Sequence, residues 1–327
     1  MESGEEQVMI SIPHSRASWL IAAFALLVFA LPAPARADVH YRTVKIDGIN
    51  VFYREAGPKN APVILLLHGF PASSFMFRDL IEQLDDKFHV IAPDYPGFGY
   101  SDAPSTREFS YTFDHLAQIV DKFTDALKLR RYALYMQDFG GPVGFRLATR
   151  HPERVSFLVV QNANAYEEGL PDEFWTPART LWNEPTPANF EKIREAAMSD
   201  AALEWNYTHG VKDPARINPD SWILQRALLN RPGNKDAMLA LLYDYRTNLG
   251  HYAAWQKYFR KHRPPMLIAW GQNDVIFPPT GARAYLRDLP DAKLHLLDTG
   301  HFALEDKADE IAKLIIETAG SARVAGR

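Results

Sequence analysis

Three side chains that can carry out nucleophilic and acid–base chemistry, Asp138, Asp274 and His301, each follow a predicted strand. A carboxylate such as Asp138 is already ionised at neutral pH, so it can attack a saturated carbon without the help of a base. The imidazole of His301 is then free to activate water against the resulting ester. The second carboxylate, Asp274, can orient the imidazole and stabilise its cation. Brought together, these residues would support displacement through a covalent ester, followed by hydrolysis.

Asp138 lies in a stretch, residues 132–144, that predicts a strand, a tight turn and a helix. The apolar strand ends at this carboxylate, and Gly140 and Gly141 allow the chain to turn into the helix. A reactive side chain at such a turn has the geometry of a nucleophile elbow, where the usual residue is Ser. An Asp that only caps the next helix is the alternative. It explains neither the two glycines nor the other polar residues at strand ends, so we predict that Asp138 is a nucleophile.

The elements around these residues predict an α/β fold. Two β-rich segments separated by Asp47 and Gly48 indicate an antiparallel hairpin. The later strands are continuous apolar runs, typical of parallel strands buried on both faces, and helical patterns separate them. The alternation predicts a doubly wound, mostly parallel sheet with ligands beyond the carboxyl ends of its strands. The eight predicted strands are 41–46, 51–55, 62–67, 89–92, 132–136, 155–160, 266–270 and 293–297.

Residues 163–262 interrupt this alternation. They contain no convincing buried strand, several helical segments and many aromatic side chains. We interpret them as a helical cap inserted into a core made of residues 38–162 and 263–327. Packing of the cap onto the core is the ordinary role of such aromatic residues.

The composition is that of an ordinary globular protein of 327 residues, 47% hydrophobic, with a formal net charge of −4. So mild a charge does not indicate a nucleic-acid or anionic-membrane partner, and no nucleic-acid-binding motif is present. The absence of Cys excludes thiol catalysis and Cys-based metal sites. The sequence also contains no dinucleotide fingerprint and no His-x-x-x-His pattern, so we predict neither cofactor nor metal.

The first 37 residues have the features of a secretory signal peptide. Arg16 precedes an apolar run, residues 19–31, and Ala35–Ala37 fits a cleavage site. The run is shorter than the ~20 residues that span a bilayer. We therefore predict an exported protein, periplasmic or secreted, whose mature chain begins at Asp38 and does not contact the membrane. An uncleaved membrane anchor is the alternative, and a start at Met9 would remove the acidic residues before it.

Five motifs resemble those of a known family: His68–Pro71, Asp94–Asp102, Gln137–Gly141, Gly271–Asp274 and Gly300–Phe302. On this basis the chain, over about residues 40–318, resembles the α/β-hydrolase superfamily. Within it, the chain is similar to the group with an Asp nucleophile, which comprises epoxide hydrolases and haloalkane dehalogenases. The order nucleophile, acid and His along the chain is that of the superfamily's triad.

The resemblance implies an α/β-hydrolase fold with Asp138, Asp274 and His301 as its catalytic triad. It also implies an oxyanion hole for the tetrahedral intermediate, formed by the backbone N–H groups of Phe70 and Phe139. Because the backbone supplies these donors, their side chains are not required for this role.

Stabilisation of the leaving group distinguishes the possible substrates. Haloalkane dehalogenases bind the halide through side-chain N–H groups, commonly a Trp after the nucleophile and an Asn in the first oxyanion loop. Phe139 and Phe70 stand at those positions here, which departs from that pattern. Epoxide hydrolases use cap tyrosines as donors to the ring oxygen. Tyr252 lies where the second such tyrosine falls, and Trp182 and Tyr207 are further candidate donors.

The sequence therefore predicts an epoxide hydrolase that converts a small apolar epoxide to a vicinal diol without a cofactor. A haloalkane dehalogenase-like hydrolase with an atypical halide site is one alternative. A non-catalytic binding protein on a hydrolase scaffold is another. Substrate identity and oligomeric state do not follow from the sequence.

Overall fold

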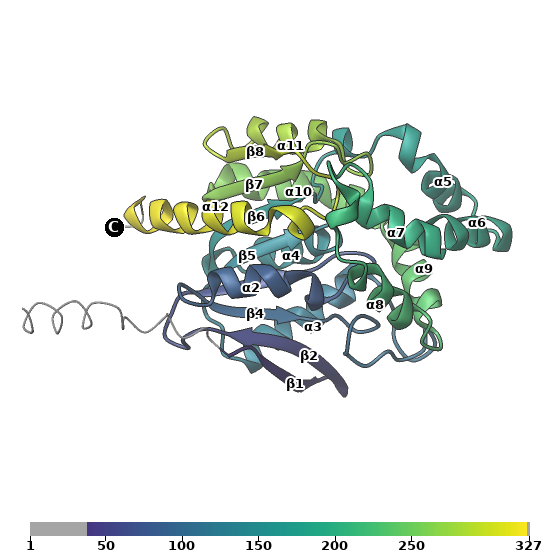
Figure 1. Ribbon diagram of the computed structural model, residues 1–327, viewed down its shortest axis with the longest axis horizontal. Helices are drawn as coiled ribbons and strands as arrows, with labels where there is room; N and C mark the ends of the chain where they lie inside the picture. The colour runs from purple at the N-terminus through teal and green to yellow at the C-terminus, as the bar shows by residue number, and fades with distance from the viewer. Residues whose placement is uncertain (1–37, 326–327) are drawn as a thin grey trace, which may run out of the picture. The chain divides into compact units, whose positions relative to one another are not determined.

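The centre of the protein is an eight-stranded sheet with the strand order β1-β2-β4-β3-β5-β6-β7-β8 (Figure 1). The structure, a computed structural model, describes residues 38–325. β1 and β2 form the predicted hairpin, β2 also pairs antiparallel with β4, and all other neighbours are parallel. The predicted α/β fold is therefore confirmed. The strands are β1 (His40–Ile46), β2 (Ile49–Ala56), β3 (Val63–Leu67), β4 (His89–Pro93), β5 (Tyr132–Gln137), β6 (Val155–Gln161), β7 (Met266–Gly271) and β8 (Lys293–Leu297).

Helices cover both faces of the sheet, and each face has its own apolar core. On one face, α2 (Arg78–Leu84) and α12 (Leu304–Ala325) bury their apolar side chains against the strands. On the other face, α3 (Phe113–Ala126), α4 (Gly140–Arg150) and α11 (Pro279–Ala284) do the same. Because the central strands are apolar on both sides and covered by the two helical layers, a ligand is expected beyond their carboxyl ends.

Local chemistry explains where several of these helices begin. The Ser73 hydroxyl accepts a hydrogen bond from the Phe75 N–H and starts the short 3-10 helix that leads into α2. Thr112 caps α3 in the same way, by accepting from the His115 N–H. Capping at both positions satisfies backbone donors that would otherwise lack partners.

Several helices lie between β6 and β7, and in Figure 1 the first five of them gather at one end of the sheet. Ser221 donates to Glu305 of α12 at 2.7 Å, and Asn234 donates to the carbonyl of Gly97 at 3.1 Å. These bonds fix the inserted helices against α12 and the loop after β4. The helices are α5 (Asp172–Asn183), α6 (Pro187–Met198), α7 (Asp200–Thr208), α8 (Asp220–Leu229), α9 (Asn234–Asp244) and α10 (Arg246–His262).

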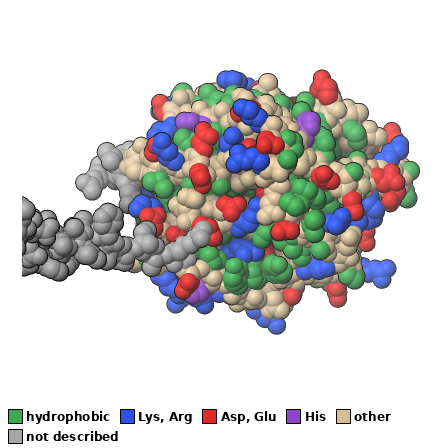
Figure 2. All heavy atoms as spheres, in the orientation of Figure 1, with side chains coloured by type: hydrophobic (Ala, Val, Ile, Leu, Met, Phe, Trp, Pro, Cys, Tyr) green, Lys and Arg blue, Asp and Glu red, His purple; other side chains and the backbone are tan. Residues whose placement is uncertain are grey.

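The predicted signal peptide, residues 1–37, lies outside the described residues. In the described part of the chain, no helix is both long enough and apolar enough to cross a membrane. Acidic and basic side chains are interspersed over the face shown in Figure 2.

Candidate active site

Asp138 stands at a sharp turn between β5 and α4, as the sequence predicts. Its φ is +48°, a left-handed conformation that is uncommon for a residue with a side chain and marks a strained turn. Gly140 is required here, since a Cβ at this position would lie 2.2 Å from the carbonyl oxygen of Leu67. Gly69 is equally constrained, because its Cβ would lie 2.3 Å from the Cβ of Asp138. The turn therefore places the Asp138 carboxylate beyond the end of the sheet, against the loop after β3.

The structure brings Asp138, Asp274 and His301 together from the ends of β5, β7 and β8. His301 Nδ1 lies 2.8 Å from Asp274 Oδ2, which is a hydrogen-bond distance. His301 Nε2 lies 3.9 Å from Asp138 Oδ2. All three side chains are buried. This is the geometry of a nucleophile, a base and an acid that orients the base.

Asn162, which the sequence analysis missed, holds the nucleophile and the acid in place. Its Nδ2 donates to Asp274 Oδ2 at 2.7 Å, and its Oδ1 accepts from the Gly271 N–H at 3.1 Å. Its backbone carbonyl accepts from the Asp138 N–H at 3.1 Å. Asn162 follows β6 with a φ of +44°, a conformation that Asn tolerates better than most residues. An Asn at the end of a buried strand was the only signal in the sequence.

The predicted oxyanion donors are directed at Asp138. The Phe70 N–H donates to Asp138 Oδ1 at 2.6 Å, and the Phe139 N–H also stabilises the ionised carboxylate. His68 supports this loop, because its Nδ1 is 3.1 Å from the carbonyl oxygen of Gly69. Burial lowers the pKa of His68 and keeps the ring neutral, which fits a structural role.

Burial and charge oppose each other at the two titrating groups. Burial raises the pKa of Asp138 to about 6, although the His301 charge and the two backbone N–H groups favour the carboxylate. Burial alone would lower the pKa of His301, but the charge and hydrogen bond of Asp274 and the charge of Asp138 raise it. Asp138 is therefore largely ionised at neutral pH, and its charge and the His301 cation stabilise each other.

A cavity of about 300 Å³ opens onto Asp138 and His301. Most of its lining is apolar, and much of it comes from α5, α6 and α7. Glu173 adds a carboxylate, and Asn206 adds an amide. The larger lining side chains are Phe70, Phe139, Phe174, Trp175, Trp205, Leu181, Leu242, Ile193 and Ile276.

Comparison with known proteins identifies the family. The family model described as "alpha/beta hydrolase fold" matches residues 62–308. This chain belongs to the α/β-hydrolase fold family. It is 44% identical, over 83% of its length and 93% of the relative's, to a Saccharomyces cerevisiae protein named only as an uncharacterized hydrolase. It is 31% identical to haloalkane dehalogenase 2 of Mycobacterium tuberculosis, over 79% of this chain and 88% of that one.

Solved structures agree with the fold of this α/β-hydrolase. The crystal structure of haloalkane dehalogenase DbeA from Bradyrhizobium elkani superposes with a TM-score of 0.72 at 22% identity, over 88% of this chain and 100% of that one. Together with the family match, these similarities show a hydrolase. The nature of its leaving group has to come from the cavity itself.

The structure does not bring the three predicted cap donors of this hydrolase into the cavity. Trp182 donates its indole N–H to the carbonyl of Leu242 at 3.0 Å. Tyr207 is buried and stacks on Phe302, with ring centroids 4.0 Å apart. Tyr252 is buried in α10 and does not line the cavity. The helical pattern placed these residues in the cap, but it did not show which side of each helix faces the nucleophile.

Tyr245, at the junction of α9 and α10, is a donor that the sequence analysis missed. Like the three predicted donors it is not part of the cavity lining, but unlike Tyr252 it is close enough for the Asp138 charge to act on it. Its side chain is fully buried, and the hydroxyl that interacts with its own is that of Tyr252. Its ring packs against Trp175 and Phe139, with centroids 5.0 and 6.1 Å apart. Burial, the neighbouring Tyr252 and the charge of Asp138 raise the pKa of Tyr245, so its hydroxyl stays protonated. A protonated hydroxyl near the nucleophile can donate to a substrate atom.

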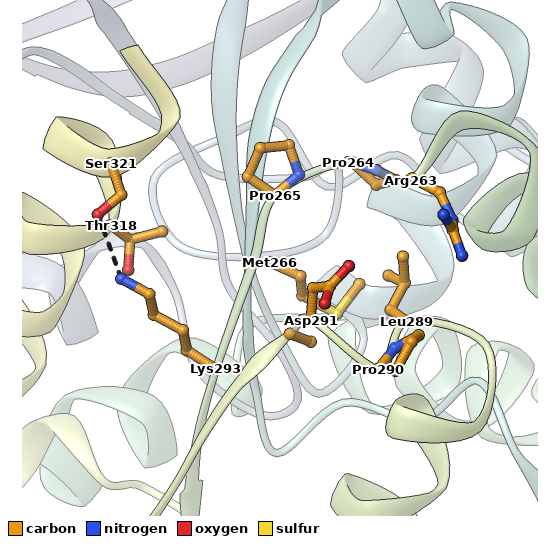
Figure 3. A pocket seen from close by; sticks show the side chains of 11 residues that line it. Arg263, Pro264, Pro265, Met266, Leu289, Pro290, Asp291, Lys293, Thr318 and Ser321 are labelled. Atoms are coloured by element: carbon orange, nitrogen blue, oxygen red, sulfur yellow. Dashed lines mark hydrogen bonds between the residues drawn. The ribbon is translucent and has the colours of Figure 1, made fainter. Parts of the chain in front are cut away.

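A second hollow, of about 260 Å³, lies at the amino ends of β7 and β8 (Figure 3). Lys293 lines it and donates to Ser321 of α12 at 3.3 Å. The described residues that line it include Arg263 and Asp291 but no His. Asp274 and His301 follow the carboxyl ends of these strands, at the opposite edge of the sheet. Among the described residues, no group of three or more His, Asp or Glu side chains is placed to hold a metal ion.

Proposed function

We propose that this α/β-hydrolase opens epoxides to vicinal diols through an ester on Asp138. In the first step, Asp138 Oδ2 attacks a ring carbon, because Oδ1 is already held by the Phe70 N–H. The carbon–oxygen bond of the ring breaks, and the released oxygen takes the proton of the Tyr245 hydroxyl. The products of this step are a hydroxyalkyl ester and a phenolate.

In the second step, His301 Nε2 takes a proton from water, and the water oxygen attacks Cγ of Asp138. The Phe70 and Phe139 N–H groups hold the oxyanion that forms. When the ester bond breaks, the diol oxygen takes the proton from His301. The proton left on the Asp138 carboxyl group returns to the Tyr245 phenolate, so the sum is epoxide plus water to diol.

The observation that carries this proposal is the set of donors around Asp138. Phe70 and Phe139 flank the carboxylate, with ring centroids 5.6 Å apart, and neither side chain has an N–H group for a halide. The indole of Trp175 lines the cavity, but its N–H donates to the carbonyl of Ile276 at 2.9 Å. The buried Tyr245 hydroxyl, by contrast, is not held by a backbone carbonyl. It interacts with the Tyr252 hydroxyl and lies near enough for the Asp138 charge to raise its pKa. An alkoxide leaving group needs such a proton donor, whereas a halide does not.

The lining of the cavity supports a small, neutral, apolar substrate. Beyond the catalytic residues, Glu173 is the one ionisable side chain in the described lining. A second carboxylate in the same lining would repel an anionic substrate and would not bind a carboxylate group. A volume of about 300 Å³ matches the low end of small-molecule sites.

A haloalkane dehalogenase-like activity is the second candidate, favoured by Trp205 and Asn206. Both line the cavity and carry side-chain N–H groups that could contact a halide. The similarity to haloalkane dehalogenase 2 of Mycobacterium tuberculosis points in the same direction.

A substrate panel tests the proposal and separates it from the second candidate. Purified protein and its Asp138→Asn variant are incubated with styrene oxide, aliphatic epoxides and terminal bromo- and chloroalkanes. We expect diol from at least one epoxide with the wild-type protein and none with the variant. Halide release without any diol would overturn the proposal in favour of the second candidate.

A further inference from the structure

Gln137, the residue before the nucleophile, contacts the ring nitrogen of His301 that has to handle the proton. Its Nε2 lies 3.0 Å from His301 Nε2, closer than Asp138 Oδ2 at 3.9 Å. Gln137 ends β5 and is fully buried. Its Oε1 has no hydrogen-bond partner within the described chain. The amide is therefore in contact with His301 on one side and has an unused acceptor on the other.

The protonation state of His301 determines whether the N–H group or the oxygen of the Gln137 amide can face Nε2. When His301 is neutral, Nδ1–H donates to Asp274 and the Nε2 lone pair can accept from the Gln137 amide N–H. When His301 is protonated, both ring nitrogens are donors, and an amide N–H facing Nε2 would be repelled. Asp138 Oδ2, at 3.9 Å, is too far away to replace it as an acceptor.

A half-turn of the Gln137 amide solves this problem, because it brings Oε1 to face the imidazolium. The turn breaks no hydrogen bond of Oε1, since this oxygen has no partner to lose. Gly69 packs closely against the amide, since a Cβ added to Gly69 would lie 2.5 Å from Gln137 Oε1. This contact keeps the amide beside the His301 ring.

We propose that Gln137 is a positioning residue for ester hydrolysis, which turns its side-chain amide to match the neutral and the protonated forms of His301. This inference rests on the proposed ester mechanism. Gln137 makes no contact that the first step requires, because Asp138 is held by Phe70 and Phe139. Its loss therefore affects the step in which His301 takes and returns a proton, and spares the attack of Asp138 on the epoxide.

The test uses Gln137→Met, which keeps the length of the side chain and removes both hydrogen-bonding groups. Rapid quench and intact mass measurement give the rates of ester formation and ester decay separately. We expect ester decay to slow by about tenfold, the size of one lost net hydrogen bond, and ester formation to change less than threefold. Equal slowing of both steps, or no slowing of decay, would overturn the inference.

Gln137→Glu and Gln161→Met give a second readout and a matched control. A carboxylate facing Nε2 favours the His301 cation, so in Gln137→Glu we expect the pH dependence of ester decay to move up by one unit or more. The charged groups that face His301 are Asp274 and, until the ester forms, Asp138. Gln161 is equally buried but donates to the backbone carbonyl of His301, at 3.1 Å. Gln161→Met should leave the position of the pH profile unchanged.

Nitrogen NMR of His301 separates a failure of this inference from a failure of the proposed function. The ring of ¹⁵N-labelled protein is titrated in wild type and in the two Gln137 variants, with His301→Gln to assign the signal. If no substrate gives an ester, the proposed function fails, and the titration still tests Gln137. The same His301 titration in all three proteins would refute the role proposed for the amide.

Discussion

Acidification should slow the first half of the reaction at a pH well above that of an ordinary Asp. The attacking group is the ionised carboxylate of Asp138, whose pKa is raised by burial from 3.8 to about 6. At pH 8 nearly all of it is ionised, and at pH 5 roughly one tenth is. The rate of ester formation at pH 5 should therefore be about a tenth of the rate at pH 8. A carboxylate with the ordinary pKa would still be more than roughly nine-tenths ionised at pH 5, with almost no loss of rate.

Single-turnover kinetics provide the assay for this prediction. Enzyme in excess is mixed with an epoxide substrate between pH 4 and 9, quenched in acid, and the fraction of alkylated protein is measured by intact mass. Ester decay gives a second, independent pH profile, because it depends on a different group. It needs neutral His301, so decay should accelerate as pH rises through the pKa of His301. In the ester, Asp274 is the carboxylate that favours the His301 cation, because Asp138 is then uncharged. A rate of ester formation that stays constant down to pH 5 would refute the argument that burial controls the nucleophile.

Two further predictions concern the stability of the folded protein and the role of the Tyr245 hydroxyl as a proton donor. Because burial raises the pKa of Asp138 in the folded protein, ionisation of this group lowers the free energy of unfolding. The loss develops as pH rises from about 4 to 6. Asp138→Asn should therefore raise the free energy of unfolding at pH 8 by up to about 3 kcal/mol, measured in urea, and this gain should vanish below pH 4. Tyr245→Phe should slow ester formation by about 10²-fold and ester decay by much less. Tyr252→Phe, the neighbouring hydroxyl, is the matched control with a smaller expected effect, and equal rates in the two variants would contradict the role given to Tyr245.

The fold and the placement of the three reactive side chains could be predicted because each depends on a local pattern. Continuous apolar runs mark buried parallel strands, and the polar residue after each run has to lie at the carboxyl edge of the sheet. Asp138, Asp274 and His301 all follow such runs, so their meeting needs no knowledge of side-chain packing. The two glycines after Asp138 reveal the turn, since a Cβ on Gly140 would meet the Leu67 carbonyl of β3 and a Cβ on Gly141 would meet Ala163.

The side chains of the cap could not be placed in this way. A helical pattern separates a buried face from an exposed one, but the aromatic residues of the cap are buried both toward the cavity and toward the core. Tyr252 and Tyr245 lie seven residues apart, about two helical turns, so the pattern gives them the same side. Only the structure shows that the Asp138 charge acts on Tyr245 and that the Trp182 N–H is used by a backbone carbonyl.

A single turnover in heavy-oxygen water tests the ester mechanism most directly. Enzyme in excess converts an epoxide in H₂¹⁸O, and the peptide that contains Asp138 is analysed by mass spectrometry. Because water attacks Cγ of Asp138 in this mechanism, one ¹⁸O atom should appear in the Asp138 carboxyl group and none in the first diol released. Label in the diol with none in Asp138 would show that water attacks the epoxide itself, and it would contradict the role of Asp138 as nucleophile.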